Sequence, residues 1–441
     1  MPSVGIVSLG CAKNRVDAEM MMYQLNQAGF VLKQDPATAD AVIVNTCGFI
    51  ESAKQESIDE ILELAQLKKE GRIKAIIVTG CLAERYNSEI MKELSEVDAV
   101  IGIGKNADIA AVVQQALDGE KVEDFPDKML LPMEGGRIQS TEQHWAYLKI
   151  ADGCDNCCTY CAIPLIRGGF RSRKMETIIE EAQRLVGNGV KELNVIAQDT
   201  TRYGLDLYDE LKLAELLKKL CRIDGLEWIR ILYCYPDRIT DELLDTIREE
   251  DKIVNNIDLP LQHCSGRVLR AMNRRGDKES LLTLVSHIRE KIPGVVLRTT
   301  MIAGFPGETD EDFEELSDFV RQARFERLGC FAYSQEEDTP AALMDGQMDE
   351  EVKNRRAGII TEQEALIMDA WCETQIGREI DVLVDGFDRY ADCFTGRSPF
   401  DAPEVDPCVF FTAPERKPQP GELVRVRVTD HIDCDLTGEM I

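Results

Sequence analysis

Short apolar runs alternate with longer amphipathic segments in the first part of the chain. Three of the runs end at or just before a cysteine: Val4–Gly10, Ala41–Thr46 and Ala75–Gly80. Between them, residues 14–27 and 52–69 carry apolar side chains at helical spacing. Continuous apolar strands that alternate with helices are typical of a parallel sheet covered on both faces. The pattern therefore predicts an α/β domain with a mostly parallel sheet over residues 1–118.

A second alternation of strands and helices begins at residue 147. The predicted strands are Tyr147–Ile150, Leu193–Ala197, Trp228–Tyr233, Ile257–Leu261, Leu297–Ala303 and Leu328–Tyr333. Helical patterns fall between them, at Ile178–Val186, Leu211–Leu220, Asp241–Glu249, Ser280–Lys291 and Asp310–Ala323. Six such units predict a partial (β/α)6 barrel, whose active site lies at the carboxyl ends of the strands.

The last part of the chain has a different pattern. A long polar helix is predicted from about Asp349 to Thr374, and two alternating segments follow, Ile380–Val384 and Leu423–Val428. Alternation of this kind indicates half-exposed strands, and the length suits a small all-β barrel. We therefore expect four regions: an amino-terminal domain at 1–118, a proline- and glycine-containing connector at 119–139, a barrel at 140–370 and a β domain at 373–441.

Composition narrows the class of protein. The chain has 80 acidic and 51 basic side chains, a net charge of −29, and no apolar run long enough to cross a membrane. Nucleic-acid binding usually needs a basic surface, so a basic partner is favoured, although an acidic soluble protein alone would also fit. Fifteen cysteines and a start without a basic, apolar leader predict a reducing, cytoplasmic location.

Three cysteines, Cys154, Cys158 and Cys161, are spaced Cys-x₃-Cys-x₂-Cys. Three thiolates on one loop can hold a four-iron cluster and leave its fourth iron open to an outside ligand. Cys157 also allows two overlapping Cys-x₂-Cys pairs, which would suit zinc. Adjacent residues point in different directions, so the open cluster is the favoured interpretation, and a disulfide framework is disfavoured.

Three further cysteines, Cys11, Cys47 and Cys81, each follow the end of a predicted strand. In open α/β sheets, ligands gather at the carboxyl ends of the strands. These thiols therefore make a second candidate site. The alternative is that each is a small buried residue at a tight turn, because many cysteines are buried and inert.

Two resemblances bear on these alternatives. The Cys154–Cys161 motif, with Tyr160 before the last cysteine, resembles the signature of the radical S-adenosylmethionine (SAM) superfamily. That resemblance implies that Cys154, Cys158 and Cys161 hold a [4Fe–4S] cluster that binds SAM, with Cys157 as a bystander. The motifs Ser8–Asn14, Val44–Ile50 and Val78–Cys81 resemble the amino-terminal domain of the methylthiotransferases, which implies an auxiliary [4Fe–4S] cluster on Cys11, Cys47 and Cys81.

Other candidates lie near the predicted strand ends. Gln198 directly follows a strand and would contact substrate or nucleoside, although the neighbouring Asp199 and Thr200 would also suit a helix cap. Arg298 lies in an apolar run and needs a carboxylate partner, from the cofactor or from the protein. Gly304 begins a Gly-Phe-Pro-Gly-Glu segment that resembles the adenosine-contact segment of the superfamily. His263 more often supports a fold than binds a ligand.

The carboxy-terminal region resembles the TRAM domain, which relatives use to bind transfer RNA. Residues 377–441 contain 7 Lys or Arg and 14 Asp or Glu, the opposite of an RNA-binding balance. Asp392, Asp401, Glu404 and Asp406 suggest an acidic surface for a Lys/Arg-rich polypeptide. A merely solvated acidic face is the alternative.

Within the methylthiotransferase family, several segments resemble the branch that modifies a ribosomal protein. They include 198–204, 329–334 and 396–403. This resemblance implies an enzyme that adds a methylthio group to the β-carbon of an aspartate in small-subunit ribosomal protein twelve, with external electron and sulfur donors. The rival functions are a transfer-RNA adenosine methylthiotransferase, which the acidic last domain disfavours, and a non-enzymatic iron–sulfur carrier.

Overall fold

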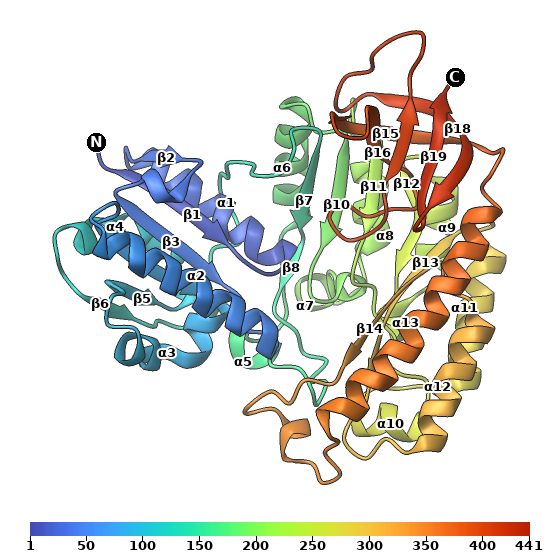
Figure 1. Ribbon diagram of the computed structural model, residues 1–441, viewed down its shortest axis with the longest axis horizontal. Coiled ribbons are helices and arrows are strands. Elements are labelled where there is room, and N and C mark those ends of the chain that lie inside the picture. Colours follow the sequence, from blue (N-terminus) through green and yellow to red (C-terminus); the bar gives the residue numbers. More distant parts are fainter. The chain divides into compact units, whose positions relative to one another are not determined.

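The structure of the chain is a computed structural model that describes residues 1–441, except the side chain of Ser88. It divides into two compact units (Figure 1). The first unit contains Met1–Ser140, Ala151–Arg173 and Ser334–Ala342, and the second contains Thr141–Ile150, Lys174–Tyr333 and Leu343–Ile441. Residues 151–173 hold the second cysteine motif, so this motif packs in one unit with the amino-terminal domain.

The first unit is built on a six-stranded parallel sheet with the order β2-β1-β3-β4-β5-β6. Its strands are β1 (Ser3–Ser8), β2 (Val31–Lys33), β3 (Ala41–Thr46), β4 (Ala75–Gly80), β5 (Ala99–Ile101) and β6 (Val122–Asp124). The helices are α1 (Ala12–Gln27), α2 (Glu51–Lys69), α3 (Cys81–Glu93) and α4 (Ile109–Leu117). The predicted parallel sheet is confirmed.

Both faces of this sheet are buried. Ile43 and Ile77 pack with residues of α1 and α4 on one face. Val44 and Val78 pack with residues of α2 and α3 on the other face. Because successive side chains of a strand point to opposite faces, burial on both sides requires the continuous apolar runs seen in β3 and β4.

The sheet extends beyond the segments that the sequence pattern identified. Strands β5 and β6 have three residues each, too few to give a periodic signal, and β6 lies inside the predicted connector at 119–139. β6 pairs with β5 in parallel, so this part of the connector belongs to the sheet.

The second unit contains another six-stranded parallel sheet, with the order β14-β13-β12-β11-β10-β7 (Figure 1). Its strands are β7 (Trp145–Lys149), β10 (Glu192–Ile196), β11 (Trp228–Ile231), β12 (Ile253–Asp258), β13 (Val296–Ala303) and β14 (Arg327–Ala332). The chain therefore winds in one direction through six neighbouring strands, as expected for a partial (β/α)6 barrel. Only β12 differs clearly from its prediction, because it begins four residues earlier, at Ile253.

Helices connect these strands. They are α6 (Met175–Gly187), α7 (Leu205–Tyr208), α8 (Leu213–Leu220), α9 (Asp241–Glu249), α10 (Gly266–Ala271), α11 (Lys278–Lys291) and α12 (Asp310–Ala323). Capping boxes explain where two of them begin: Asp277 with Ser280 at α11, and Thr309 with Asp312 at α12. The long helix α13 (Glu350–Glu373) packs on β14. Across the described residues, no helix is both long enough and apolar enough to cross a membrane.

A closed barrel with the strand order β15-β16-β17-β19-β18 ends the chain. Its strands are β15 (Glu379–Asp388), β16 (Cys393–Arg397), β17 (Val409–Thr412), β18 (Leu423–Ile432) and β19 (Asp435–Met440). Phe394, Phe411 and Val426 lie in its core, which continues to Trp371 of α13. The predicted small β-barrel is confirmed.

The loop after β16 joins this barrel to the parallel sheet through buried ionic contacts. Arg230 of β11 donates to Glu192 of β10 at 3.0 Å and to the carbonyl oxygens of Ser398 and Pro399 at 3.2 and 2.9 Å. Arg397 forms an ion pair with the same Glu192. The loop is thus held by hydrogen bonds on strands of the sheet.

These contacts correct one interpretation of the acidic residues. Asp401 is 2% exposed and pairs with Arg327 of β14 at 2.7 Å, and Asp406 pairs with Arg298 of β13 at 3.1 Å. Two of the four predicted carboxylates, Asp401 and Asp406, therefore pair with arginines of the parallel sheet. For this reason Asp392, Asp401, Glu404 and Asp406 do not form one acidic surface. The paired residues are 74 and 108 residues apart in the sequence, so the sequence pattern could not indicate that they pair.

Candidate functional site

The first cysteine triplet lies at one edge of the amino-terminal sheet. Cys11 follows β1, Cys47 follows β3 directly, and Cys81 is the first residue of α3, directly after β4. Strands β1, β3 and β4 are parallel neighbours, so their carboxyl ends meet at the same edge. A Cβ atom on Gly10 would lie 2.8 Å from Cys47 Sγ, so the absence of a side chain at Gly10 allows the two loops to approach.

Two asparagines hold these strand ends together. The Asn14 side chain donates to the carbonyl oxygens of Leu9, Asn45 and Thr46 at 2.8, 3.2 and 3.1 Å. The Asn45 amide donates back to the Asn14 carbonyl at 2.7 Å. These bonds satisfy backbone groups that the sheet leaves unpaired, and they fix the loops that carry Cys11 and Cys47.

The three thiols differ in their electrostatic surroundings. Burial raises the pKa of Cys47 and raises that of Cys81 to about 12, although Arg167 acts in the opposite direction on both. Cys11 is the exposed member of the triplet. Desolvation by neighbouring atoms opposes its ionisation, but Lys13 and Arg167 outweigh this effect and lower its pKa. Each thiol thus responds to the charge of the same arginine.

The second triplet lies on a loop that is closed at its base. Strands β8 (Ala151–Asp152) and β9 (Arg171–Ser172) pair there, and the Cys154 N–H donates to the Gly168 carbonyl at 3.1 Å. Gly153 has φ +77°, and a Cβ atom on it would lie 2.1 Å from the Gly169 carbonyl oxygen. Only glycine allows this closure.

Within the loop, the Cys161 N–H donates to the Cys158 carbonyl at 3.0 Å, which forms a tight turn. Cys154, Cys158 and Cys161 are half-buried. Cys157 is more exposed and has a left-handed backbone, with φ +49°. That Cys157 is a bystander stays a prediction.

Arg167 links the two triplets within the first unit. It ends helix α5 (Ile163–Arg167), and its guanidinium donates to Asp152 at 2.8 Å, Asp17 at 2.9 Å and Asn14 at 3.2 Å. It also lies 3.9 Å from Cys81 Sγ. Ala162 and Ile166 of the same helical turn pack against Cys81. The cysteine loop is therefore fixed against the end of the amino-terminal sheet.

Residues 334–342, which we call the strap, make a second link in this unit. Arg85 of α3 donates to Glu336 of the strap at 2.6 Å and to the Gly48 carbonyl at 3.0 Å. The Ala341 N–H donates to the Thr159 carbonyl, inside the second triplet, at 2.9 Å. The strap thus contacts the surroundings of both triplets.

The three residues that were predicted to contact the cofactor, Gln198, Arg298 and Gly304, all lie in the second unit. Gln198 is half-buried two residues after β10, and Asp199 caps the following turn by accepting from the Arg202 N–H. Arg298 lies 3.4 Å from Asp258 and 3.1 Å from Asp406, so its partners in this structure are protein carboxylates. This is the second of the two alternatives that the sequence left open for Arg298.

Gly304 follows β13 with φ +77°, and its N–H donates to Glu308 Oε2 at 2.8 Å. His263 is fully buried, accepts from the Ser265 N–H at 3.0 Å and lies 3.4 Å from Glu308. His263 therefore has the supporting role that we expected. A contact of Gln198 or Gly304 with nucleoside stays a prediction.

The donor sets suit iron–sulfur clusters. Both triplets consist of thiols on loops that glycines and asparagines hold in place, and thiolate is the usual ligand of such clusters. Across the described side chains, no three metal-binding groups are placed to hold one ion together.

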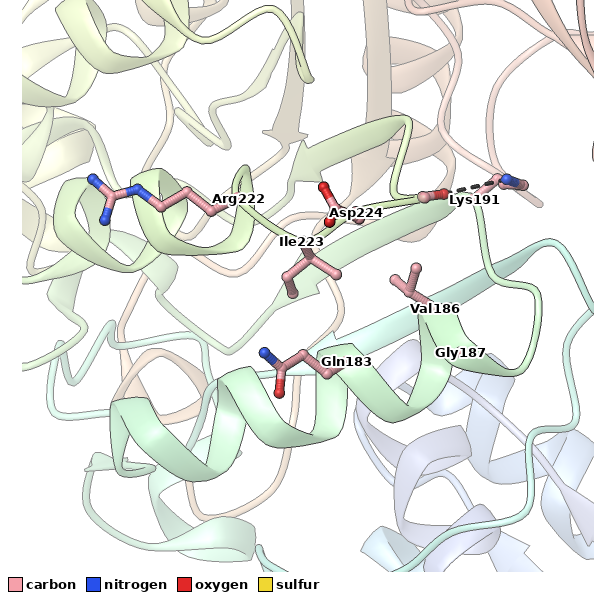
Figure 2. A pocket seen from close by; sticks show the side chains of 8 residues that line it. Gln183, Val186, Gly187, Lys191, Arg222, Ile223 and Asp224 are labelled. Carbon is pink, nitrogen blue, oxygen red and sulfur yellow. Dashed lines mark hydrogen bonds between the residues drawn. The ribbon is translucent and has the colours of Figure 1, made fainter.

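A surface pocket of the second unit does not involve these residues. It has a volume of about 370 Å³ and lies between the end of α6 and the segment before β11 (Figure 2). Gln183, Lys191 and Arg222 are among its lining residues. None of the predicted site residues lines it, and we assign it no function.

The residues that sequence reasoning missed are Arg167, Asp17 and Asp152. Arg167 lies only six residues after Cys161, but its partner Asp17 is 150 residues away in the sequence. Arg167 directly follows the apolar stretch Ala162–Ile166, and this is the signal that would have found it, because a buried charge needs a partner. Asp17 lies among charged residues and gives no such signal. Asn14 lay within a motif that was noted only for its cysteine.

Comparison with known protein families agrees with this architecture. Residues 3–102 match the uncharacterized protein family UPF0004, residues 148–320 match the radical SAM superfamily, and residues 376–441 match the TRAM domain. The fold and the two cysteine triplets thus define the class: a radical SAM protein with an additional amino-terminal domain and a TRAM domain.

Curated relatives narrow the class further. The chain is 48% identical to a ribosomal protein uS12 methylthiotransferase RimO of Desulforamulus reducens, over the full length of both chains. It is 48% identical to the RimO of Lachnoclostridium phytofermentans over 98% of each chain. It is 46% identical to the RimO of Clostridioides difficile, over 100% of this chain and 99% of that one. The chain belongs to the RimO family of ribosomal protein uS12 methylthiotransferases.

Solved structures show a related fold at low identity. The radical SAM methyltransferase TsrM from Kitasatospora setae is 13% identical, with a TM-score of 0.56 over 88% of this chain and 79% of that one. The cobalamin-dependent radical SAM enzyme OxsB is 11% identical, with a TM-score of 0.52 over 82% of this chain and 56% of that one. At these identities the likeness concerns the fold alone.

Proposed function

We propose that this chain is a radical SAM methylthiotransferase that modifies the β-carbon of an aspartate in ribosomal protein uS12. The full-length identity to RimO proteins supports the reaction and the substrate. The observation that carries the proposal is structural: two cysteine triplets, on separate loops, pack within one compact unit. A simple electron carrier would need neither an iron without a protein ligand nor a six-unit barrel.

In this proposal, Cys11, Cys47 and Cys81 hold the auxiliary [4Fe–4S] cluster, and Cys154, Cys158 and Cys161 hold the SAM-binding cluster. When bound, the clusters and SAM supply reductive radical formation and the methylthio group. The chain itself holds the two loops in fixed geometry, through Arg167 and through the strap. An unactivated β-C–H bond has no acidity that a general base can use, so no protein acid or base is assigned to that step.

The partners follow from the same proposal. A basic ribosomal protein suits a chain with a net charge of −29, whereas a transfer-RNA substrate would favour a basic last domain. Electrons and sulfur come from external donors, and the enzyme acts in the cytoplasm. Because Asp401 and Asp406 pair with arginines, and Glu404 accepts a hydrogen bond from the Tyr147 hydroxyl at 3.1 Å, other exposed carboxylates of the last barrel, such as Asp392, are the ones that would contact uS12.

An assay with two substrates tests the function. Anaerobically reconstituted enzyme is supplied with SAM, sulfide and reductant, together with either uS12 or transfer RNA. We expect mass spectrometry to find the methylthio group on an aspartate of uS12 and none on the RNA. Modification of the RNA alone would overturn the substrate assignment.

Triple variants separate the roles of the triplets. Replacing Cys154, Cys158 and Cys161 by Ala should abolish 5′-deoxyadenosine formation. Replacing Cys11, Cys47 and Cys81 by Ala should leave 5′-deoxyadenosine formation but remove methylthio transfer. Equal loss of 5′-deoxyadenosine in both variants would contradict this division of roles.

A further inference from the structure

Arg167 is a fully buried cation beside a site of thiols. Its side chain is 1% exposed, and its partner carboxylates Asp17 and Asp152 are 3% and 0% exposed. Bringing charges into a protein interior is costly unless each one has a partner. The guanidinium of Arg167 pairs with both carboxylates, at 2.9 Å from Asp17 and 2.8 Å from Asp152.

The arginine also lies beside the first triplet. Its guanidinium donates to Asn14, whose side chain holds the loops of Cys11 and Cys47. Its contact with Cys81 is direct, at 3.9 Å. A cluster held by three thiolates adds negative charge at this position, and one-electron reduction of the cluster adds one further negative charge. A nearby cation stabilises the reduced form, and a nearby carboxylate destabilises it.

The position of Arg167 has a second consequence. Asp152 receives the guanidinium on one oxygen, and its other oxygen accepts the Gly153 N–H at 2.8 Å, one residue before Cys154. On the opposite side, Asn14 receives the guanidinium and holds the ends of β1 and β3. A single planar group thus connects the supports of both triplets. Lysine carries the same charge but cannot form this fork.

We propose that Arg167 is a positioning residue of the auxiliary cluster: its guanidinium fixes the second cysteine loop against the first triplet and raises the reduction potential of the auxiliary cluster against the effect of Asp17 and Asp152. This inference rests on the proposed function, because it requires a cluster on Cys11, Cys47 and Cys81. It assigns to Arg167 a role that the cysteine motifs alone do not reveal.

The test measures the potential of the auxiliary cluster by itself. In the full-length chain, Cys154, Cys158 and Cys161 are replaced by Ala, and the protein is reconstituted with iron and sulfide. Titanium(III) citrate then donates one electron per cluster, and electron paramagnetic resonance follows the reduced form. Arg167→Met should lower the equilibrium constant for reduction at least tenfold, or about 59 mV for one electron.

Two further variants separate charge from geometry. Arg167→Lys keeps the charge, so its potential should stay within about a threefold change in the equilibrium constant, or about 30 mV, while the weakened fork lowers the thermal stability of the metal-free protein. Asp17→Asn removes a negative charge and should shift the potential in the positive direction. A purely structural role for Arg167 would not give shifts of opposite sign in Arg167→Met and Asp17→Asn.

The control is Arg327→Met in the same background. It also removes a buried arginine from an ion pair, but in the second unit and beside Asp401, and it should leave the potential unchanged. Equal potentials in Arg167→Met and the parent, or shifts of the same sign in Arg167→Met and Asp17→Asn, would overturn the inference. If Arg167→Met does not fold, the positive shift expected for Asp17→Asn and the nearly unchanged potential expected for Arg167→Lys still decide, and a negative shift in Asp17→Asn overturns the inference. A parent without any cluster would overturn the proposed function itself, and the inference with it.

Discussion

Both units bury arginines, but the surroundings of these arginines differ. In the second unit, Arg327 and Arg397 face carboxylates of the protein: Asp401 for the first, and Glu192 and Asp385 for the second. In the first unit, Arg167 divides its donors among carboxylates and an amide, and it also contacts a thiol. An arginine that faces only carboxylates of the protein anchors two elements to each other. An arginine that also contacts a cysteine thiol acts, in addition, on the cluster that this thiol would hold.

The largest effect is expected from breaking the complete ion pair. Arg327→Met leaves Asp401 buried without its cation, which should reduce the free energy of unfolding by about 3–5 kcal/mol. Chemical denaturation of the metal-free protein measures this loss. The double variant Arg327→Met/Asp401→Leu removes both charges and should recover most of the stability. A double variant that is less stable than Arg327→Met would contradict the anchoring role.

A pH-dependent effect arises next to Arg327. Glu364 of α13 is 4% exposed, and burial raises its pKa to about 8, more than Arg327 lowers it. The folded state therefore holds a proton that the unfolded state releases above its ordinary pKa of 4.5, so stability falls as the pH rises from about 5 to 8. Between pH 5 and 7, the wild type should lose about 2–3 kcal/mol relative to Glu364→Gln, which has no proton to release.

Unfolding curves of both proteins at the two pH values measure this difference. Parallel pH profiles for the wild type and Glu364→Gln would show that the carboxyl group is ionised in the folded protein. In that case Arg327 would stabilise two carboxylates, Asp401 and Glu364, as Arg167 does in the first unit, and the difference between the two units would be smaller.

The smallest expected effect on stability lies in the first unit. Gly10→Ala puts a Cβ atom 2.8 Å from Cys47 Sγ, at φ +88°. Gly29→Ala has the same φ, but only the distant Met1 side chain is near it, at 3.9 Å. Both variants should lose about 1–2 kcal/mol through backbone strain. Only Gly10→Ala should also lose the auxiliary cluster, as measured by iron content, and equal iron content in the two variants would contradict the close approach of these loops.

Much of the fold could be predicted because its signals are local. Strands β3 and β4 were predicted at their observed residues, since strands buried on both faces are continuously apolar. The two cysteine triplets followed from short motifs. In contrast, β5 and β6 are too short to show a period, and β6 was assigned to a connector.

The charged contacts could not be predicted in this way. The charge of Asp401 and Asp406 was visible in the sequence, but their partners Arg327 and Arg298 lie in another domain, so the residues were interpreted as an acidic surface. Arg167 was missed for the same reason. Ion-pair partners depend on the packing of segments that are distant in the sequence, and no periodic pattern of residues indicates which of them pair.

The most direct test of the account is a count of clusters per chain. Iron and sulfide are quantified in the anaerobically reconstituted wild type and in the two triple variants, Cys11/Cys47/Cys81→Ala and Cys154/Cys158/Cys161→Ala, with Mössbauer spectroscopy to identify the cluster type. The account predicts two [4Fe–4S] clusters in the wild type and one in each triple variant. One cluster in the wild type, unchanged when Cys11, Cys47 and Cys81 are replaced, would contradict it.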